Sequence, residues 1–196
     1  MLIICNFKSN RINQSYIDKI KNIDTNNKII LLPNSKDIND YDFRSINYGS
    51  QNIIDKTYKY VLLGHHDVRD KEDNNVINNK VLECITLGIN VILCVNSLDV
   101  LKKDVKNINN FKNIIIAYEE DEYIGSNNIL EIEKTDEFIK EAKKITKGEA
   151  KIVYGGGINK SNIKKLCTIK DLDGIILGTA CNNINDLISI IEMVNN

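Results

Sequence analysis

Residues 91–118, VILCVNSLDVLKKDVKNINNFKNIIIAY, decide the fold. Two apolar runs, 91–95 and 114–118, enclose a stretch whose apolar residues recur at helical spacing after Ser97, a favourable helix N-cap. Continuous apolar runs rich in β-branched residues are typical of strands buried on both faces of a parallel sheet. The stretch therefore predicts a strand, a helix within 97–111 and a second strand parallel to the first.

The same alternation of a short apolar run and an amphipathic stretch continues in both directions along the chain. Further helices are predicted over 74–88, where Gly88 is placed to end the helix, over 134–147 and over 182–194. Eight such βα units favour a closed (βα)8 barrel over an open sheet, and without a linker we expect one domain over 1–196. The expected strands are 2–6, 28–32, 46–51, 60–63, 91–95, 114–118, 151–154 and 173–177.

The connection between the third and fourth expected strands is unusually short. A parallel crossover usually needs a dozen or more residues, but only the stretch 52–59 lies between these strands. About eight extended residues span at most about 28 Å, which returns the chain along a strand without room for a full helix. We therefore expect the barrel's third helix to be missing or reduced to one turn.

Composition excludes several classes of protein. The 196 residues carry a net charge of −1 without a block of like charge, so we expect no nucleic-acid partner. No segment approaches the ~20 apolar residues of a membrane span, and the apolar run at 2–6 is too short for a signal peptide. Five scattered cysteines without CxxC pairing predict reduced thiols, packed as small buried hydrophobes, in a cytoplasmic protein.

Chemically useful side chains directly follow three of the expected strands. Asn6 and Lys8 follow the first strand, His65 the fourth and Glu119 the sixth. Barrels of this class place their chemistry at the carboxyl ends of the strands, which all meet at one face. A carboxylate there can abstract a proton next to a carbonyl that an imidazole polarises, while a cation and an amide stabilise the resulting enediolate. A buried structural role for the histidine is the alternative.

Small residues follow the last two expected strands. The run Gly155-Gly156-Gly157 follows the seventh strand, and Gly178-Thr179 follows the eighth. Glycine lets backbone N–H groups approach an anion closely, and the corresponding loops of these barrels often bind phosphate. Ordinary turn glycines are the alternative explanation.

A metal site at His65 and His66 is the weaker interpretation of the histidine pair. Adjacent residues on an extended chain point to opposite faces, and no third ligand stands out nearby. We therefore expect no metal.

Six blocks of sequence together resemble the triosephosphate isomerase family. Each block is weak by itself, but all six occur in the family's order and at strand ends, and GSQN at 49–52 resembles the family's third strand end. The blocks are NFKSN at 6–10, YVLLGH at 60–65, ILCV at 92–95, AYE at 117–119 with IGS at 124–126, YGG at 154–156 and DGIILG at 173–178.

The resemblance implies a TIM barrel that interconverts glyceraldehyde 3-phosphate and dihydroxyacetone phosphate in glycolysis and gluconeogenesis without cofactor or metal. It implies that Glu119 is the base that moves the proton between two carbons. His65 would be a neutral electrophile assisted by a helix that begins near His66. Lys8 and Asn6 would stabilise charge on the substrate and the transition state.

The resemblance also implies binding and supporting roles. Ile124 and Ile176 would shield Glu119 from water, Tyr154 would latch a mobile lid and Asp67 would pair with the lysine of the site. Four residues would offer backbone N–H groups to the phosphate: Gly125, Gly157, Gly178 and Thr179.

Several positions depart from the family's pattern. The acids Glu120-Asp121-Glu122 stand where the family has the lid's first hinge, and facing inward they would repel a phosphate. His66 and Gly157 each replace a serine. Thr179 replaces a glycine, which is tolerable only at negative φ.

The stretch 52–59 also lacks the long arm with which the family's dimers support the partner's site. We therefore expect a monomer or a dimer formed through another surface.

Two other functions fit parts of the pattern. One is a catalytically impaired paralogue that binds a phosphorylated metabolite or a protein partner, suggested by the acidic lid and the short connection. The other is a different phosphate-binding barrel enzyme, such as an epimerase, a synthase or a lyase. The residues after the first, fourth and sixth strands fit the isomerase better.

Overall fold

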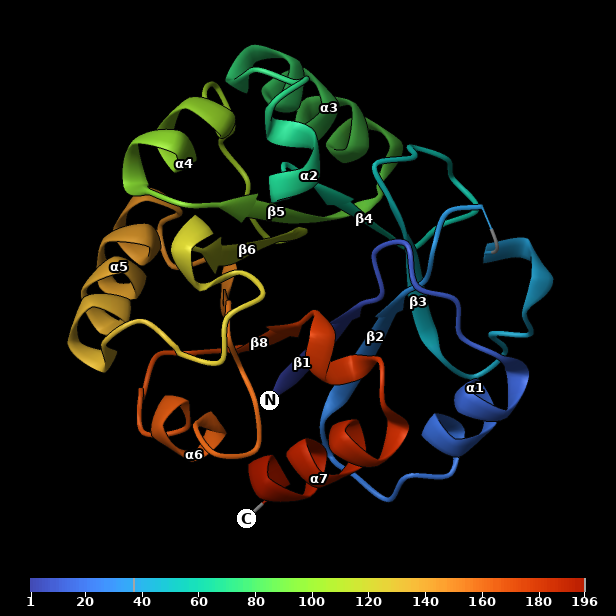
Figure 1. Cartoon of the computed structure of the whole chain (residues 1–196). Coiled ribbons are helices and arrows are strands. Elements are labelled where there is room, and N and C mark those ends of the chain that lie inside the picture. Colours follow the sequence, from blue (N-terminus) through green and yellow to red (C-terminus); the bar gives the residue numbers. More distant parts are fainter. Residues whose placement is uncertain (37, 196) are drawn as a thin grey trace.

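The computed structural model describes residues 1–36 and 38–195, and its eight strands form a closed parallel barrel (Figure 1). Pairing of β1 (Leu2–Asn6) with β8 (Gly174–Leu177) closes the ring. This confirms the predicted TIM barrel, and each strand lies within one residue of its expected bounds. The other strands are β2 (Lys28–Leu32), β3 (Asn47–Gln51), β4 (Tyr60–Leu63), β5 (Asn90–Val95), β6 (Ile114–Glu119) and β7 (Lys151–Gly155).

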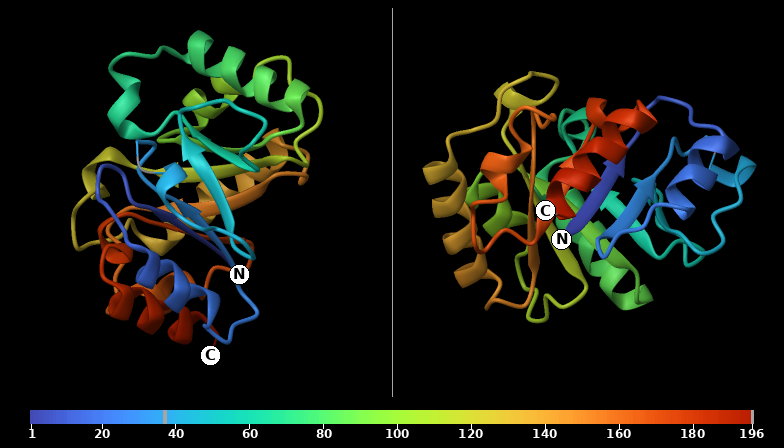
Figure 2. Two further views of the ribbon diagram at one scale, coloured as in Figure 1. Left: turned by 90° about the vertical axis from the view of Figure 1, so that its right-hand side faces the viewer. Right: turned by 90° about the horizontal axis from the view of Figure 1, so that it is seen from below.

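Most of the helices surround the barrel, as the views from the side and from below show (Figure 2). None of them is long and apolar enough to cross a membrane. The helices of the described residues are α1 (Gln14–Lys21), α2 (His66–Arg69), α3 (Asn74–Leu87), α4 (Leu98–Asp104), α5 (Ile132–Ile145), α6 (Ile163–Leu166) and α7 (Ile184–Asn195). Three 3-10 turns are η1 (Ile38–Asp40), η2 (Asp121–Tyr123) and η3 (Thr179–Cys181).

Local sequence signals explain where two of these helices begin or end. The Ser97 side chain accepts a hydrogen bond from the N–H of Val100 and so starts α4, while Gly88 ends α3 in the left-handed conformation at φ 73°. Helix α4 ends at Asp104 and so occupies only the first part of the predicted range 97–111. The chain leaves the helix there and turns at Asn107, which has a φ of 63°.

The β3–β4 connection contains no helix, as its length predicted. Residues 52–59 form only a tight turn, in which the N–H of Tyr58 bonds the carbonyl of Asp55 at 3.0 Å. Among its described residues, the β2–β3 connection carries only the 3-10 turn η1, which the pattern of eight equal βα units did not predict. The barrel is therefore covered most thinly around β3 (Figure 1).

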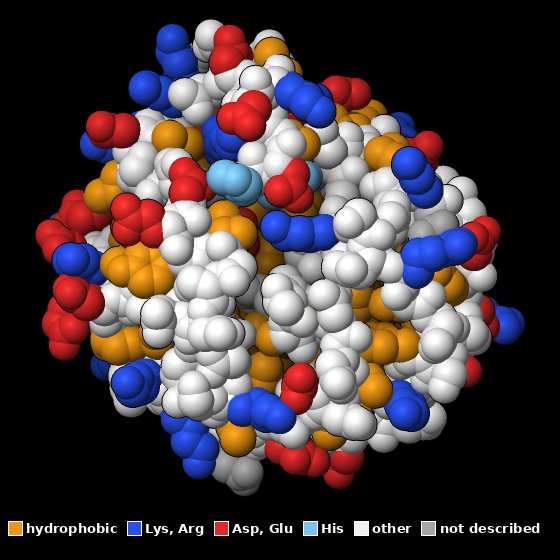
Figure 3. All heavy atoms as spheres, in the orientation of Figure 1, with side chains coloured by type: hydrophobic (Ala, Val, Ile, Leu, Met, Phe, Trp, Pro, Cys, Tyr) orange, Lys and Arg blue, Asp and Glu red, His pale blue; other side chains and the backbone are white. Residues whose placement is uncertain are grey.

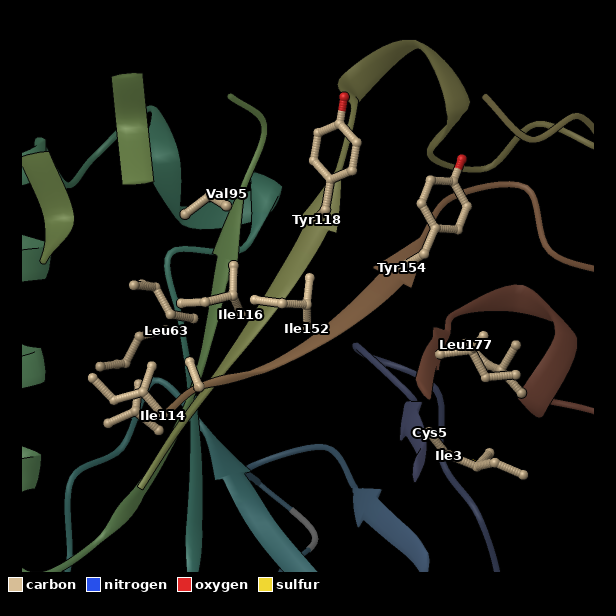
Figure 4. Packing of buried hydrophobic residues seen from close by; sticks show 14 of the residues in the cluster. Ile3, Cys5, Leu63, Val95, Ile114, Ile116, Tyr118, Ile152, Tyr154 and Leu177 are labelled. Atoms are coloured by element: carbon tan, nitrogen blue, oxygen red, sulfur yellow. The ribbon is translucent and has the colours of Figure 1, made fainter. Parts of the chain in front are cut away.

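Apolar side chains form two shells because successive residues of a strand point to opposite faces. The outer shell packs between strands and helices, and Figure 4 shows it along β6 and β7. The inner shell fills the barrel and contains Leu2, Ile4, Ile30, Leu32, Tyr60, Leu62, Ile92, Cys94, Ile115, Ala117, Val153 and Ile176.

The cysteines are all free, and four of the five are buried. Cys167 is exposed, so the expectation that every cysteine is a buried hydrophobe is wrong at that position.

Candidate active site

The end of β1 positions Asn6 and Lys8 through their backbone as well as their side chains. Asn6 is buried, and its Oδ1 accepts the N–H of Lys8 at 3.0 Å. The Gln51 side chain, from the end of β3, donates to the Lys8 carbonyl at 3.1 Å. Lys8 itself has a φ of 51°, a conformation that costs a non-glycine residue free energy. These contacts hold the backbone of Lys8 in place at the end of β1.

His65 follows β4 and is almost fully buried. Its Nδ1 lies 3.9 Å from Asp67 Oδ2, too far for a hydrogen bond, and has no partner among the described residues. Asp67 also lies 3.7 Å from the Nζ of Lys8. Burial is the largest cause that lowers the pKa of His65; Asp67 opposes the shift and Lys8 adds to it. Desolvation therefore favours the neutral imidazole. The short helix α2 begins at His66, directly after this residue, where the resemblance implied a helix start.

Glu119 ends β6 and is partly buried. Burial raises the pKa of Glu119, whereas a hydrogen-bonding contact with the Cys94 thiol and the charge of Lys8 act in the opposite direction. The same contact and burial raise the pKa of Cys94 well above its ordinary value, so this thiol stays protonated. A carboxylate with a raised pKa is a better base than a solvated one.

A pocket of about 110 Å³ brings most of the expected site residues together at the carboxyl face of the barrel. The φ of Thr179 lies outside the left-handed region. This is the condition under which a threonine can replace the family's glycine at this position. Of the expected residues, Asn6, Lys8, Glu119, Ile124, Ile176, Gly125, Gly157, Gly178 and Thr179 line the pocket. Three expected residues do not line it: His65, Asp67 and Tyr154. Asp67 lies between His65, at 3.9 Å, and the pocket residue Lys8, at 3.7 Å.

The segment 120–130, which we call the lid, lies folded down on the β7 loop. The Tyr154 hydroxyl accepts the N–H of Leu130 at 2.9 Å, and Asn159 donates to the Asn127 carbonyl at 2.9 Å. Tyr154 stands beside Tyr118 at the strand ends (Figure 4), with ring centroids 6.1 Å apart. The lid therefore has specific contacts in this position.

The three acids of the lid do not line the pocket. Asp121 bonds His66 at 3.0 Å and Asn96 at 3.1 Å, and Glu120 accepts a hydrogen bond from Tyr118 at 2.5 Å. Figure 3 shows histidine and acidic side chains gathered along one rim of a central hollow. None of these acids therefore faces into the pocket, although the charge of Asp121 contributes to the raised pKa of Glu119.

The sequence did not single out several residues that the structure places at the site. Asn10, Ser126 and Asn182 line the pocket. The first two belong to the family-like blocks NFKSN and IGS, which could have indicated them. Nothing in the sequence pointed to Asn182. Arg69 donates to the carbonyls of Gly64 at 2.8 Å and Cys94 at 2.5 Å, and so ties the end of β4 to that of β5. Such contacts between distant segments leave no pattern in a single sequence.

The fold and the pocket define a (βα)8-barrel protein whose carboxyl face combines ionisable side chains with glycine-rich loops around one pocket. Among the described residues, no three His, Cys, Asp or Glu side chains gather as metal ligands would.

Comparison with known proteins gives the family. The family model for triosephosphate isomerase matches residues 48–194. The triosephosphate isomerase of Blochmanniella floridana is 31% identical over 210 aligned positions, which cover 92% of this chain and 80% of that protein. Those of Mycoplasma mobile and Campylobacter concisus are 31% and 32% identical over 71% and 68% of this chain. This chain belongs to the triosephosphate isomerase family.

The match to some relatives covers only part of their length. It spans 64% of the Mycoplasma mobile protein and 63% of the Campylobacter concisus protein, slightly less than two thirds of each.

Proposed function

We propose that this protein interconverts glyceraldehyde 3-phosphate and dihydroxyacetone phosphate. The observation that carries the proposal is the shared pocket: Glu119, Lys8 and Asn6 line the same small cavity as the glycine-rich loops after β7 and β8. A phosphate held by backbone N–H groups of those loops leaves the carbon end of a triose near the carboxylate. The names of the relatives support the same reaction.

The proposed reaction moves one proton between adjacent carbons. Glu119 takes the proton from the carbon next to the carbonyl and returns it to the neighbouring carbon, and its raised pKa suits this task. Neutral His65 donates to the carbonyl oxygen, and Lys8 and Asn6 stabilise the enediolate. Ile124 and Ile176 exclude water from the carboxylate, and the phosphate is bound by Gly125, Gly157, Gly178 and Thr179. No cofactor or metal enters this scheme.

The decisive test compares the parent protein with Glu119→Gln, both purified from a host that lacks its own isomerase. A coupled assay follows conversion of glyceraldehyde 3-phosphate. Removing the base is expected to lower kcat by about 10²- to 10⁴-fold with little change in KM. Equal rates in both proteins would mean that the parent has no such activity of its own.

We further propose a cytoplasmic location and a place in glycolysis and gluconeogenesis. The free state of all five cysteines is typical of a reducing compartment.

A further inference from the structure

Three loops converge on the carboxylate of Asp121, the first residue of the turn η2. Its Oδ1 lies 3.0 Å from His66 Nδ1, at the start of α2, and its Oδ2 accepts the amide of Asn96 at 3.1 Å, after β5. Both carboxylate oxygens thus have a side-chain partner. We call these three residues the clasp.

The clasp joins the lid to the barrel beside the proposed base. Asp121 is two residues after Glu119 and three before Ile124. Glu119 and Ile124 form a wall shared by two cavities. Both residues line the substrate pocket, and both line a second, smaller cavity. All three members of the clasp also line this second cavity. A shift of Asp121 therefore moves the wall that both residues form.

The lid has a second attachment at its far end. Tyr154 and Asn159 hold Leu130 and Asn127 there, as described above. Between the two attachments, Tyr123 packs over Gly156, where an added Cβ would lie 3.1 Å from the Cβ of the tyrosine. The clasp therefore attaches the lid on the side of the base, beside the hydrogen bond from Tyr118 to Glu120.

We propose that Asp121, held by His66 and Asn96, is a positioning residue that keeps the lid closed over the substrate. It acts through the placement of Glu119 and Ile124 rather than by touching the substrate. The part of the proposal that concerns substrate rests on the proposed isomerase function, whereas the attachment of the lid does not. In this chain, hydrogen bonds among three side chains anchor the first hinge of the lid.

Hydrogen exchange of the ligand-free protein, read by mass spectrometry over residues 120–130, tests the clasp without any assay of activity. We expect Asp121→Ala and His66→Ala each to exchange about two- to tenfold faster in this segment, the range of one or two exposed hydrogen bonds. The double variant should be no faster than Asp121→Ala, because both changes break one unit. Glu122→Ala is the matched control and should exchange like the parent, and unchanged exchange in 132–145 shows that the barrel is intact.

Two results would overturn the clasp. One is an Asp121→Ala variant that exchanges like the parent. The other is a double variant in which the effects of the two single variants multiply. In an active protein the same variants should raise KM by a similar factor and change kcat less. Faster exchange in a protein without isomerase activity would uphold the clasp and refute the proposed function alone.

Discussion

Glu119 illustrates how one residue can serve chemistry at the expense of stability. Its carboxylate has a pKa raised chiefly by burial, so the ionised form is less favourable in the folded protein than in the unfolded chain. The folded state therefore holds this proton more tightly than the unfolded state does. Stability falls as the pH rises from the unfolded pKa through the folded one, and the deficit is complete above that window.

Glu119→Gln is consequently expected to stabilise the protein at pH 7. A gain of about 1 kcal/mol, which raises the Tm by about 2–4 °C, is the usual size when a functional residue is neutralised. The gain should shrink towards pH 4, where the parent carboxyl becomes protonated. Calorimetry at pH 7 and near pH 4 measures both effects, with the lid residue Glu122→Gln as the control. A variant less stable than its parent at pH 7 would contradict this account.

At the same scale, the sequence predicted those site residues that follow directly after a strand. Asn6, Lys8 and Glu119 could be found because the carboxyl ends of barrel strands point to one face. The contact of Cys94 with Glu119 and that of Gln51 with Lys8 join different strands. Such pairs depend on the register of neighbouring strands, which no local pattern specifies.

At the scale of elements, Arg69 connects four segments through one guanidinium group. Besides the carbonyls of Gly64, after β4, and Cys94, in β5, it bonds the fully buried Asp104 of α4 at 2.6 Å and Asn74 of α3 at 3.1 Å. Only a planar group with five donors can satisfy acceptors in so many directions. Arg69 thus fixes the end of β4, where His65 begins the next loop.

Arg69→Lys should lower the free energy of unfolding by about 2–3 kcal/mol, because a lysine leaves buried acceptors unsatisfied. Urea denaturation measures the change. Arg44→Lys is the control: that guanidinium is paired with Asp42 at an exposed site, and its replacement should change stability by less than about 0.5 kcal/mol. Equal effects at the two positions would refute the bridging role.

The bounds of elements were predictable where a single residue carries the signal. Ser97 and Gly88 are such residues, since an N-cap side chain and a left-handed C-terminal residue act within one turn. The early end of α4 and the reduction of the β2–β3 connection to η1 were not predicted. Helical spacing persists in the sequence beyond Asp104, and the left-handed Asn107 that follows is only a weak signal by itself.

For the whole molecule, the short β3–β4 connection bears on assembly. The loop of Lys8 is held from within the same chain, by Gln51 at its carbonyl and Asp67 near its ammonium. The Lys8 loop is therefore supported by contacts within one chain.

We expect a monomer, or a dimer that leaves residues 52–59 exposed. Light scattering at micromolar concentration gives the mass, and hydrogen exchange of 52–59 at high and low protein concentration shows whether the segment becomes buried. A tight dimer that protects this segment would contradict the expectation.

Gly157 links the β7 loop to the lid, so that a change in one of these segments affects the other. Its φ is 62°, and a Cβ at this position would lie 1.7 Å from the carbonyl oxygen of Asn128 in the lid. A serine at 157 and the lid in its present place are therefore mutually exclusive. A serine placed at position 157 would push the backbone at Asn128 away from the β7 loop. Exchanging one of these two segments for a relative's therefore requires the other to be exchanged with it.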